Sequence, residues 1–515
     1  MKHLPILLLI SGIAFAILTR FVLPFEHVFT PGGIQLNTPD AYIMVRYADM
    51  LPYSIQWDWY SNWPTGQQPF HYLVFSFLIW ISAKIMQVST LTAGAVLPPV
   101  IFLLALVPVY YTARMLFDRT IAAGSVFALC LLPGEILQRT MLGAADYHCW
   151  EVLLLCSILA CAIAAIQRHS WFMVFATAAI SAIYLFSWQG APIILLILAL
   201  ACLIALFLKL DYIGRSAMTF GLVAIIGLCC NIAPVYLPYL HSNFLGLFSI
   251  NLLRPTVEAQ SFLFTSGQFD LSVMLTYFGL TFWIALIGIG WLIYRVIARC
   301  DNADILFLSW SLVTLAMMIA QRRFDYYFAV NGAILAAFVV VAVIRYIGSN
   351  QAIRAAVVVA LVLCLPLVKQ SVMTSMSDTG YMPADWQKAV VWLQSESNSK
   401  AYYAGERPKY GILSWWNNGY WITGAGHQSV ICDNGNQDFD GTAANLLMAP
   451  DYDATMAKLK DMQVKYVIID KAMLTSSLYP IMLKARHGST DSFMFKLYQQ
   501  QPLCQYGQLK IYMVY

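Results

Sequence analysis

Residues 191–208 read APIILLILALACLIALFL and carry no charged side chain, and Lys209 follows them directly. A helix that crosses the hydrocarbon core of a bilayer needs about 20 mostly apolar residues. This stretch therefore predicts a transmembrane helix. The whole chain shares the bias, because 60% of its 515 residues are hydrophobic and only 11% are charged. That composition excludes a single soluble globular domain and indicates a polytopic membrane protein.

Other apolar stretches of similar length predict about eleven spans in total. They cover residues 4–23, 93–113, 120–138, 149–167, 171–188, 191–208, 216–236, 273–294, 303–320, 326–344 and 353–369. Residues 70–87 are also apolar, but a span there would place both ends of the chain on the same side of the membrane. We predict that this stretch is a re-entrant or interfacial helix.

The positive charges predict the orientation, because Lys and Arg of short loops are retained on the cytoplasmic side. With a cytoplasmic N-terminus, the inner loops carry Arg114, Arg119, Arg168, Lys209, Arg215, Arg295, Arg299, Arg345 and Arg354. The predicted membrane domain then covers residues 1–372, with external loops 24–92, 139–148 and 237–272. Residues 373–515 form an extracytoplasmic domain. The net charge of +4 is scattered along the chain, which indicates no nucleic-acid partner.

The external loops contain acidic residues and a histidine close to predicted spans: Asp40, Asp146, His148 and Glu258. Ionisable groups at membrane depth are costly, so each is a functional hypothesis. Carboxylate and imidazole ligands suit Mn²⁺ or Mg²⁺ better than a thiolate-rich zinc site would. A divalent ion held there could neutralise a phosphate leaving group.

A single acid in an external loop can also be an interfacial carboxylate in water. We favour this simpler interpretation for Asp49, Asp58 and Asp270. It is weaker for Asp146 and His148, because a helix cap alone does not need the histidine.

Two arginines depart from the charge pattern, since Arg322 and Arg323 end a span on the external side. Their side chains could extend to lipid headgroups. Alternatively, one guanidinium binds a lipid-linked phosphate, whose oxygens match its fork of donors.

The composition becomes more polar beyond about residue 375, and a mixed α/β domain is predicted. We expect a helix in 382–397 and strands in 401–406, 428–435, 464–471 and 508–515. In SWWNNGYWI, one of Trp415 and Trp416 is expected in the core and the other on a peptide-binding surface. Cys432 and Cys504 could form a disulfide if this domain faces an oxidising compartment.

Taken together, these segments resemble the catalytic subunit of oligosaccharyltransferases, in its single-subunit prokaryotic form, within the GT-C superfamily. The resemblance runs nearly end to end. It rests on six motifs in order: NTPDAY (37–42), RTMLGAADYH (139–148), LLRPTVEAQ (252–260), RRFDYYFAV (322–330), SWWNNGYWI (414–422) and IIDKAML (468–474). The implied fold is a multi-span α-helical membrane domain, typically of thirteen spans in this family, followed by a small α/β domain.

The resemblance also implies a reaction, in which an oligosaccharide moves from a polyprenyl (pyro)phosphate carrier to an asparagine amide, with inversion. Asp40, Asp146 and His148 would hold the Mn²⁺ or Mg²⁺ ion. Asp40 and Glu258 would hydrogen-bond the acceptor amide, and Asp146 would belong to the catalytic set. The resemblance also implies that the reaction takes place at the outer face of a prokaryotic plasma membrane and that one subunit catalyses it alone.

Binding roles follow from the later motifs. Arg323 would bind the donor phosphate, and Trp415, Trp416, Asn417 and Met473 would bind an acceptor with an Asn-x-Ser/Thr sequon. The chain departs from the family at Asn417, where the family has aspartate, and this puts the strength of sequon recognition in question. Two alternatives stay open: another lipid-phosphate-dependent glycosyltransferase, of the protein O-glycosylation or O-antigen ligase type, and a non-catalytic relative.

Overall fold

The chain forms two compact units in a computed structural model. The structure describes residues 3–53, 57–69, 73–187, 190–191, 193–208, 260–265, 268–347, 350–377, 380–435, 441–475 and 491–515. The helical unit comprises Met1–Glu26, Pro98–Leu142 and Tyr147–Ser377, and the sheet unit comprises His27–Leu97, Gly143–Asp146 and Asp378–Tyr515. The predicted span 216–236 and Glu258 lie outside the described residues.

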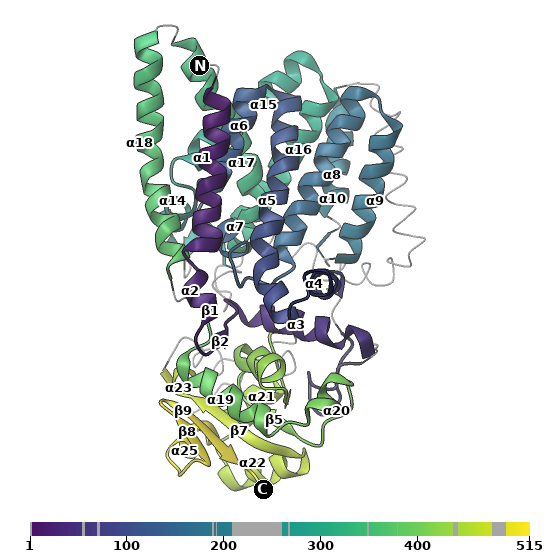
Figure 1. Ribbon diagram of the computed structural model, residues 1–515, viewed down its shortest axis with the longest axis vertical. Coiled ribbons are helices and arrows are strands. Elements are labelled where there is room, and N and C mark those ends of the chain that lie inside the picture. The colour runs from purple at the N-terminus through teal and green to yellow at the C-terminus, as the bar shows by residue number, and fades with distance from the viewer. Residues whose placement is uncertain are drawn as a thin grey trace. The chain divides into compact units, whose positions relative to one another are not determined.

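Long apolar helices build the helical unit (Figure 1). They are α1 (Leu4–Ile17), most of α5 (Thr90–Leu116), α6 (Arg119–Leu131), α8 (His148–Arg168), α9 (Trp171–Ser187), α10 (Ile193–Phe207), α15 (Thr281–Arg299), α16 (Asn302–Ala320), α17 (Asp325–Tyr346) and α18 (Asn350–Ser375). Within the described part of the chain, six helical segments are long and apolar enough to cross a membrane. The prediction of a multi-span α-helical membrane protein is therefore confirmed.

Ion pairs join several of these helices at the ends that carry the predicted cytoplasmic charges. Asp118 caps α6, and its carboxylate lies 2.6 Å from Arg345 at the end of α17. Arg295 of α15 lies 2.6 Å from Asp304 of α16 and donates to the carbonyl of Leu116 at the end of α5. Two of the basic residues that predicted the orientation, Arg295 and Arg345, therefore also connect helix ends.

Two predicted spans are interrupted. Predicted span 273–294 is divided into α14 (Ser272–Phe278) and α15, because Gly279 adopts a φ of +54° between them. Predicted span 120–138 is divided into α6 and the short α7 (Glu135–Gln138), because Pro133 interrupts the helix. Apolar composition predicted the location of these helices, but their ends depend on Gly and Pro.

The sheet unit is built on a five-stranded sheet with the order β6-β5-β7-β9-β8. Its strands are β5 (Gly411–Leu413), β6 (Ser429–Val430), β7 (Val464–Asp470), β8 (Cys504–Tyr506) and β9 (Leu509–Met513). Strand β5 pairs in parallel with β6 and β7, whereas β9 pairs antiparallel with β7 and β8. Helices α19 (Ala384–Ser395), α21 (Thr442–Leu447), α22 (Tyr452–Asp461) and α25 (Phe493–Tyr498) complete the mixed α/β domain that the sequence predicts.

Most of the predicted first external loop belongs to this same unit. The N–H of Trp63 donates to the carbonyl of Val430 in β6, and the N–H of Val430 donates to the carbonyl of Tyr60. The Trp63 indole also donates to the carbonyl of Met462, at 2.7 Å. The compact units therefore do not follow the predicted division at residue 372, because residues 27–97 belong with the C-terminal segment.

The loop also contributes helices α3 (Pro39–Met50) and α4 (Leu73–Met86), which pack against each other. At about 1.5 Å per residue, the 14 residues of α4 reach about 21 Å, less than the roughly 30 Å of a hydrocarbon core. Its length agrees with the prediction of an interfacial or re-entrant helix for residues 70–87.

Two expectations for the C-terminal segment were wrong. Residues 401–406 form no strand: helix α20 (Ser399–Tyr403) begins where Asn398 accepts from the N–H of Ala401, and the turn that follows contains Gly405 at a φ of +68°. Cys432 and Cys504 are not joined by a disulfide. Cys432 follows β6 and Cys504 begins β8, at opposite edges of the sheet, and strands about 4.8 Å apart keep the two sulfurs too distant to bond.

Candidate functional site

Two acidic loops of the sheet unit lie side by side. Thr38 caps α3 by accepting from the N–H of Ala41, which places Asp40 in the first helical turn. The N–H of Asn37 donates to the carbonyl of Gly143 at 3.1 Å, so the loop before Asp40 touches the loop that leads to Asp146. A helix N-terminus favours a negative group, which suits a carboxylate at Asp40.

Gly143 makes this approach possible. Its φ is +83°, and a Cβ there would lie 3.3 Å from the amide nitrogen of Asn37 and 2.9 Å from the side chain of Val28. A larger residue would strain the backbone and push the two loops apart. Asp146, three residues later, is only 4% exposed.

The predicted metal ligands divide between the units, with Asp40 and Asp146 in one and His148 in the other. Within the described ranges, no three His, Cys, Asp or Glu side chains form a group that could hold a metal. The donor chemistry nevertheless fits a hard divalent cation, because Asp40 and Asp146 supply carboxylate oxygens from neighbouring loops. The ligand set stays a prediction.

In the helical unit, His148 belongs to a buried polar network at the start of α8. Its Nδ1 lies 3.1 Å from the hydroxyl of Tyr326 and 3.4 Å from the carboxylate of Glu151. Glu151 accepts from Tyr326 at 2.9 Å and from Tyr327 at 2.5 Å. The orientation of His148 is therefore set in part by α17, which begins two residues after Arg323. The sequence analysis missed both tyrosines, although they lie within the quoted RRFDYYFAV.

The two neighbouring arginines have different surroundings. Arg322 is buried, and its guanidinium donates to the carbonyls of Ser261 and Phe264. Arg323 is half-buried, with its guanidinium 5.0 Å from the ring centre of Phe324. Its Nε has no hydrogen-bond partner among the described residues. This geometry makes Arg322 a structural residue and leaves Arg323 as the better candidate for binding an anion.

The WWNNG segment begins at Trp415, two residues after the end of β5. Trp415 is 2% exposed and belongs to the core of the sheet unit, whereas Trp416 is half-buried and packs against that core. The expectation that one tryptophan lies in the core is confirmed. Gly419, the last residue of the segment, packs against the backbone of Asp433. Only glycine fits there, because a Cβ would lie 2.4 Å from the Cα of Asp433.

Asn417 and Met473 have different surroundings. The side-chain oxygen of Asn417 is buried and has no hydrogen-bond partner in the described part of the chain. Met473, in α23 (Lys471–Thr475), is fully buried, and its sulfur lies 3.9 Å from the amide nitrogen of Asn418. Asn418 also donates to Ser414, so the second asparagine ties the motif to both neighbours. The peptide-binding roles of these residues stay predictions.

Asp58 is not the carboxylate in water that we favoured from the sequence. It forms a fully buried ion pair with Arg46, whose guanidinium donates to both carboxylate oxygens, at 2.6 and 2.9 Å. Burial alone would raise the pKa of Asp58, but Arg46 and the hydrogen bonds from Tyr60 and Tyr47 lower it below its ordinary value. The prediction failed because nothing in the local sequence announces a partner twelve residues away.

No model of a protein family matches the chain. Among curated proteins, it is 23% identical to the dolichyl-phosphooligosaccharide-protein glycotransferase 3 of Archaeoglobus fulgidus, over 93% of this chain and 70% of that protein. The oligosaccharyltransferase of A. fulgidus, solved with an inhibitory peptide and a dolichol-phosphate, superposes with a TM-score of 0.78 at 20% identity. This match covers 95% of the present chain and 72% of the other.

The chain is similar in sequence and fold to archaeal oligosaccharyltransferases. A second structure of the A. fulgidus enzyme, tethered to an acceptor peptide with an NVT sequon, matches with a TM-score of 0.76 at 21% identity, covering 95% of this chain and 71% of that one. The predicted family resemblance and fold class are thus confirmed. These matches cover 95% of the chain, so the likeness in fold extends through both units.

Proposed function

We propose that this chain is an oligosaccharyltransferase that moves an oligosaccharide from a polyprenyl (pyro)phosphate carrier to the side-chain amide of asparagine in acceptor proteins, with inversion. The observation that carries the proposal is the similarity to archaeal glycotransferases along 93% of the chain. A protein O-glycosylating enzyme would need neither the paired tryptophans nor the acidic motif at Glu258, so we prefer the N-linked reaction.

The acceptor side of the proposal rests on the sheet unit. An asparagine amide is a poor nucleophile, because its lone pair is delocalised into the carbonyl. We propose that Asp40 and Glu258 hydrogen-bond its NH₂ and hold it for attack on the anomeric carbon, with Asp146 completing the acidic set. A carboxylate accepts such bonds more strongly than a neutral group does.

Sequon recognition is assigned to Trp415, Trp416, Asn417 and Met473. The Asn417 oxygen, which has no hydrogen-bond partner among the described residues, could accept the hydroxyl proton of Ser or Thr two residues after the acceptor asparagine. Without a negative charge, that bond is weaker than one to an aspartate by about 1 kcal/mol. We therefore expect weaker discrimination of the hydroxyl than a carboxylate would give.

The donor side is assigned to Arg323, whose guanidinium would bind a phosphate oxygen of the lipid carrier. Asp40, Asp146 and His148 would hold Mn²⁺ or Mg²⁺, which when bound supplies positive charge for the departing phosphate. Tyr326 keeps the His148 ring in place through its 3.1 Å contact. We place the reaction at the external face of a prokaryotic plasma membrane, with one subunit sufficient for transfer.

Transfer from an extracted lipid-linked donor to a fluorescent Asn-x-Thr peptide tests this function in the presence of Mn²⁺ or EDTA. We expect no transfer in EDTA. Loss of a residue that only hydrogen-bonds to a metal ligand already lowers metal affinity or activity about 10- to 100-fold. Loss of a ligand should cost more, so Asp146→Ala should reduce the transfer rate by at least about 100-fold. Asp461→Ala, at an exposed carboxylate of α22, is the matched control and should transfer normally. Undiminished transfer in EDTA and by Asp146→Ala would contradict the metal assignment.

A further inference from the structure

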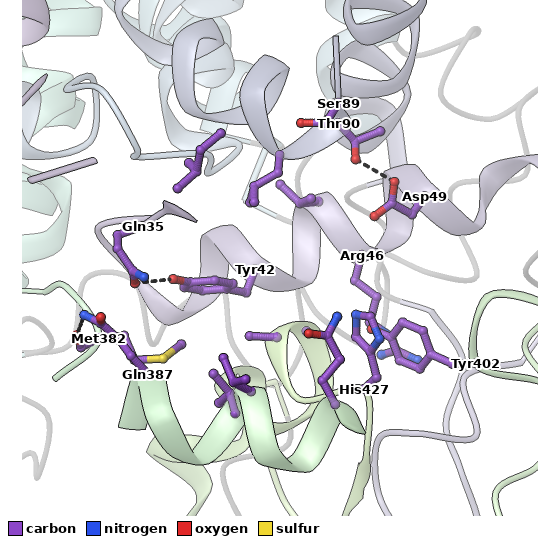
Figure 2. A pocket seen from close by; sticks show the side chains of 18 of the residues that line it. Gln35, Tyr42, Arg46, Asp49, Ser89, Thr90, Met382, Gln387, Tyr402 and His427 are labelled. Atoms are coloured by element: carbon purple, nitrogen blue, oxygen red, sulfur yellow. Dashed lines mark hydrogen bonds between the residues drawn. The ribbon is translucent and has the colours of Figure 1, made fainter. Parts of the chain in front are cut away.

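A cavity of about 460 Å³ lies within the sheet unit (Figure 2). Residues of α3, the first turn of α5, α19, α20 and the π-helical turn η7 (Trp421–Ala425) line it. His427, two residues after η7, lines it as well. The volume is within the range of about 300–1,000 Å³ that is usual for small-molecule sites. Exposed residues at its edge, among them Ser89 and Gln394, show that it opens to the surface.

The cavity is separate from the acidic residues assigned to transfer. Tyr42, Arg46 and Asp49 of α3 line it (Figure 2). At about 100° per residue, each of these three lies at least about 120° around the helix from Asp40. None of the residues assigned to donor, metal or acceptor binding lines the cavity.

The charges of the wall do not favour an anionic ligand. Arg46 is already bound to both oxygens of Asp58. Burial, with a smaller contribution from Arg46, lowers the pKa of His427 to about 4, so its imidazole is neutral at pH 7. Among the described lining residues, Asp49 supplies a further carboxylate, which accepts from Thr90 at 2.5 Å. A phosphate would thus meet no unpaired cation among the described lining residues.

The remaining wall offers ring faces beside amides and hydroxyls. The His427 ring stacks on Tyr402 with centroids 4.1 Å apart and 15° between the planes, and Tyr403 packs edge-on against it at 5.4 Å. The Nδ1 atom of His427 has no hydrogen-bond partner among the described residues. Gln387 and Gln394 add amide side chains. Amides and carboxylates can bind neighbouring hydroxyls, while aromatic faces cover the C–H surface of a sugar ring.

We propose that this cavity binds a neutral segment of a glycan. The ligand is either part of the donor oligosaccharide or a glycan already attached to the acceptor polypeptide, and the proposal rests on the proposed function for the presence of such glycans. The site would recognise sugar units away from the phosphate, since its wall offers no free positive charge.

Equilibrium dialysis with the full-length protein in detergent tests the proposal without any transfer step. The probe is a fluorescently labelled oligosaccharide released by mild acid from the lipid-linked pool, with inorganic pyrophosphate and an unglycosylated peptide as competitors. Tyr403→Ala removes a ring and Gln394→Ala removes an exposed amide, each expected to raise the Kd about 3- to 10-fold. Gln499→Ala, at an exposed glutamine after α25, is the matched control and should leave the Kd unchanged.

The two sources of glycan are separated by a second pair of measurements. If the donor is the ligand, the cavity variants raise the KM for the lipid-linked donor. If the acceptor glycan is the ligand, they weaken binding of a glycopeptide and leave the donor KM unchanged. Equal Kd values for wild type and both variants, or displacement by the unglycosylated peptide or by pyrophosphate, would overturn the proposal. A further outcome is that the wild type fails to transfer glycan to asparagine while the variants still bind glycan more weakly than the wild type. That result would overturn the proposed function and leave the cavity assignment standing.

Discussion

Removing the charge of Asp58 should destabilise the sheet unit strongly. The carboxylate accepts five hydrogen bonds, two from Arg46 and one each from Tyr47, Tyr60 and Ser61, and both side chains of the ion pair are fully buried. Removing one partner of a buried pair costs about 3–5 kcal/mol, because the other charge is left without compensation. At roughly 2–4 °C per kcal/mol for a domain of this size class, Asp58→Asn should lower the Tm by roughly 6–20 °C.

The assay is thermal unfolding of the full-length protein in detergent, followed by tryptophan fluorescence. The double variant Arg46→Met/Asp58→Asn should be more stable than Asp58→Asn alone, because it removes the buried guanidinium and keeps an oxygen for Tyr47 and Ser61. Asp453→Asn, at an exposed carboxylate in α22, is the control and should stay within about 0.5 kcal/mol of wild type. A Tm shift below about 2 °C for Asp58→Asn, or a double variant no more stable than Asp58→Asn alone, would refute the reasoning.

Three further predictions concern pH, the paired arginines and the glycine of the WWNNG segment. Because the folded-state pKa of Asp58 is lowered, its contribution is fully present above the ordinary carboxyl pKa of about 3.9 and is lost as the pH falls below it, so the Tm difference between wild type and Asp58→Asn should shrink below pH 4. Arg323→Met should raise the donor KM about 10- to 100-fold with an unchanged Tm, whereas Arg322→Met should lower the Tm; a reversed pattern in kinetics and unfolding would contradict the assignment. Gly419→Ala, whose Cβ would lie 2.4 Å from a backbone Cα, should cost about 1–3 kcal/mol in unfolding experiments, and the control Gly290→Ala, with no atom within 4 Å, should cost nothing.

Helix location was largely predictable because apolar length is a local property of the sequence. The span predicted at 326–344 corresponds to α17, and the predicted helix at 382–397 contains α19. Helix interruptions were less predictable. A glycine in an apolar stretch, such as Gly279, is compatible with a continuous helix until its φ is known.

Contacts between distant segments could not be predicted from one sequence. The insertion of Trp63 beside β6 joins residues more than three hundred positions apart, and no local pattern indicates it. The same holds for Tyr326 and His148, which lie on different helices. Motif resemblance located candidate residues and favoured Arg323 over Arg322, but only the packing gave Arg322 its carbonyl partners and distinguished Trp415 from Trp416.

The account's central claim is tested most directly by mass spectrometry of peptides incubated with the protein, Mn²⁺ and a lipid-linked oligosaccharide. The peptides carry Asn-x-Thr, Gln-x-Thr or Asn-x-Ala and are otherwise identical. We predict a glycan on the asparagine of Asn-x-Thr, none on Gln-x-Thr, and weaker modification of Asn-x-Ala, with the ratio set by the uncharged oxygen of Asn417. A glycan on the threonine, or no transfer from any lipid-linked donor, would contradict N-glycosylation by this chain.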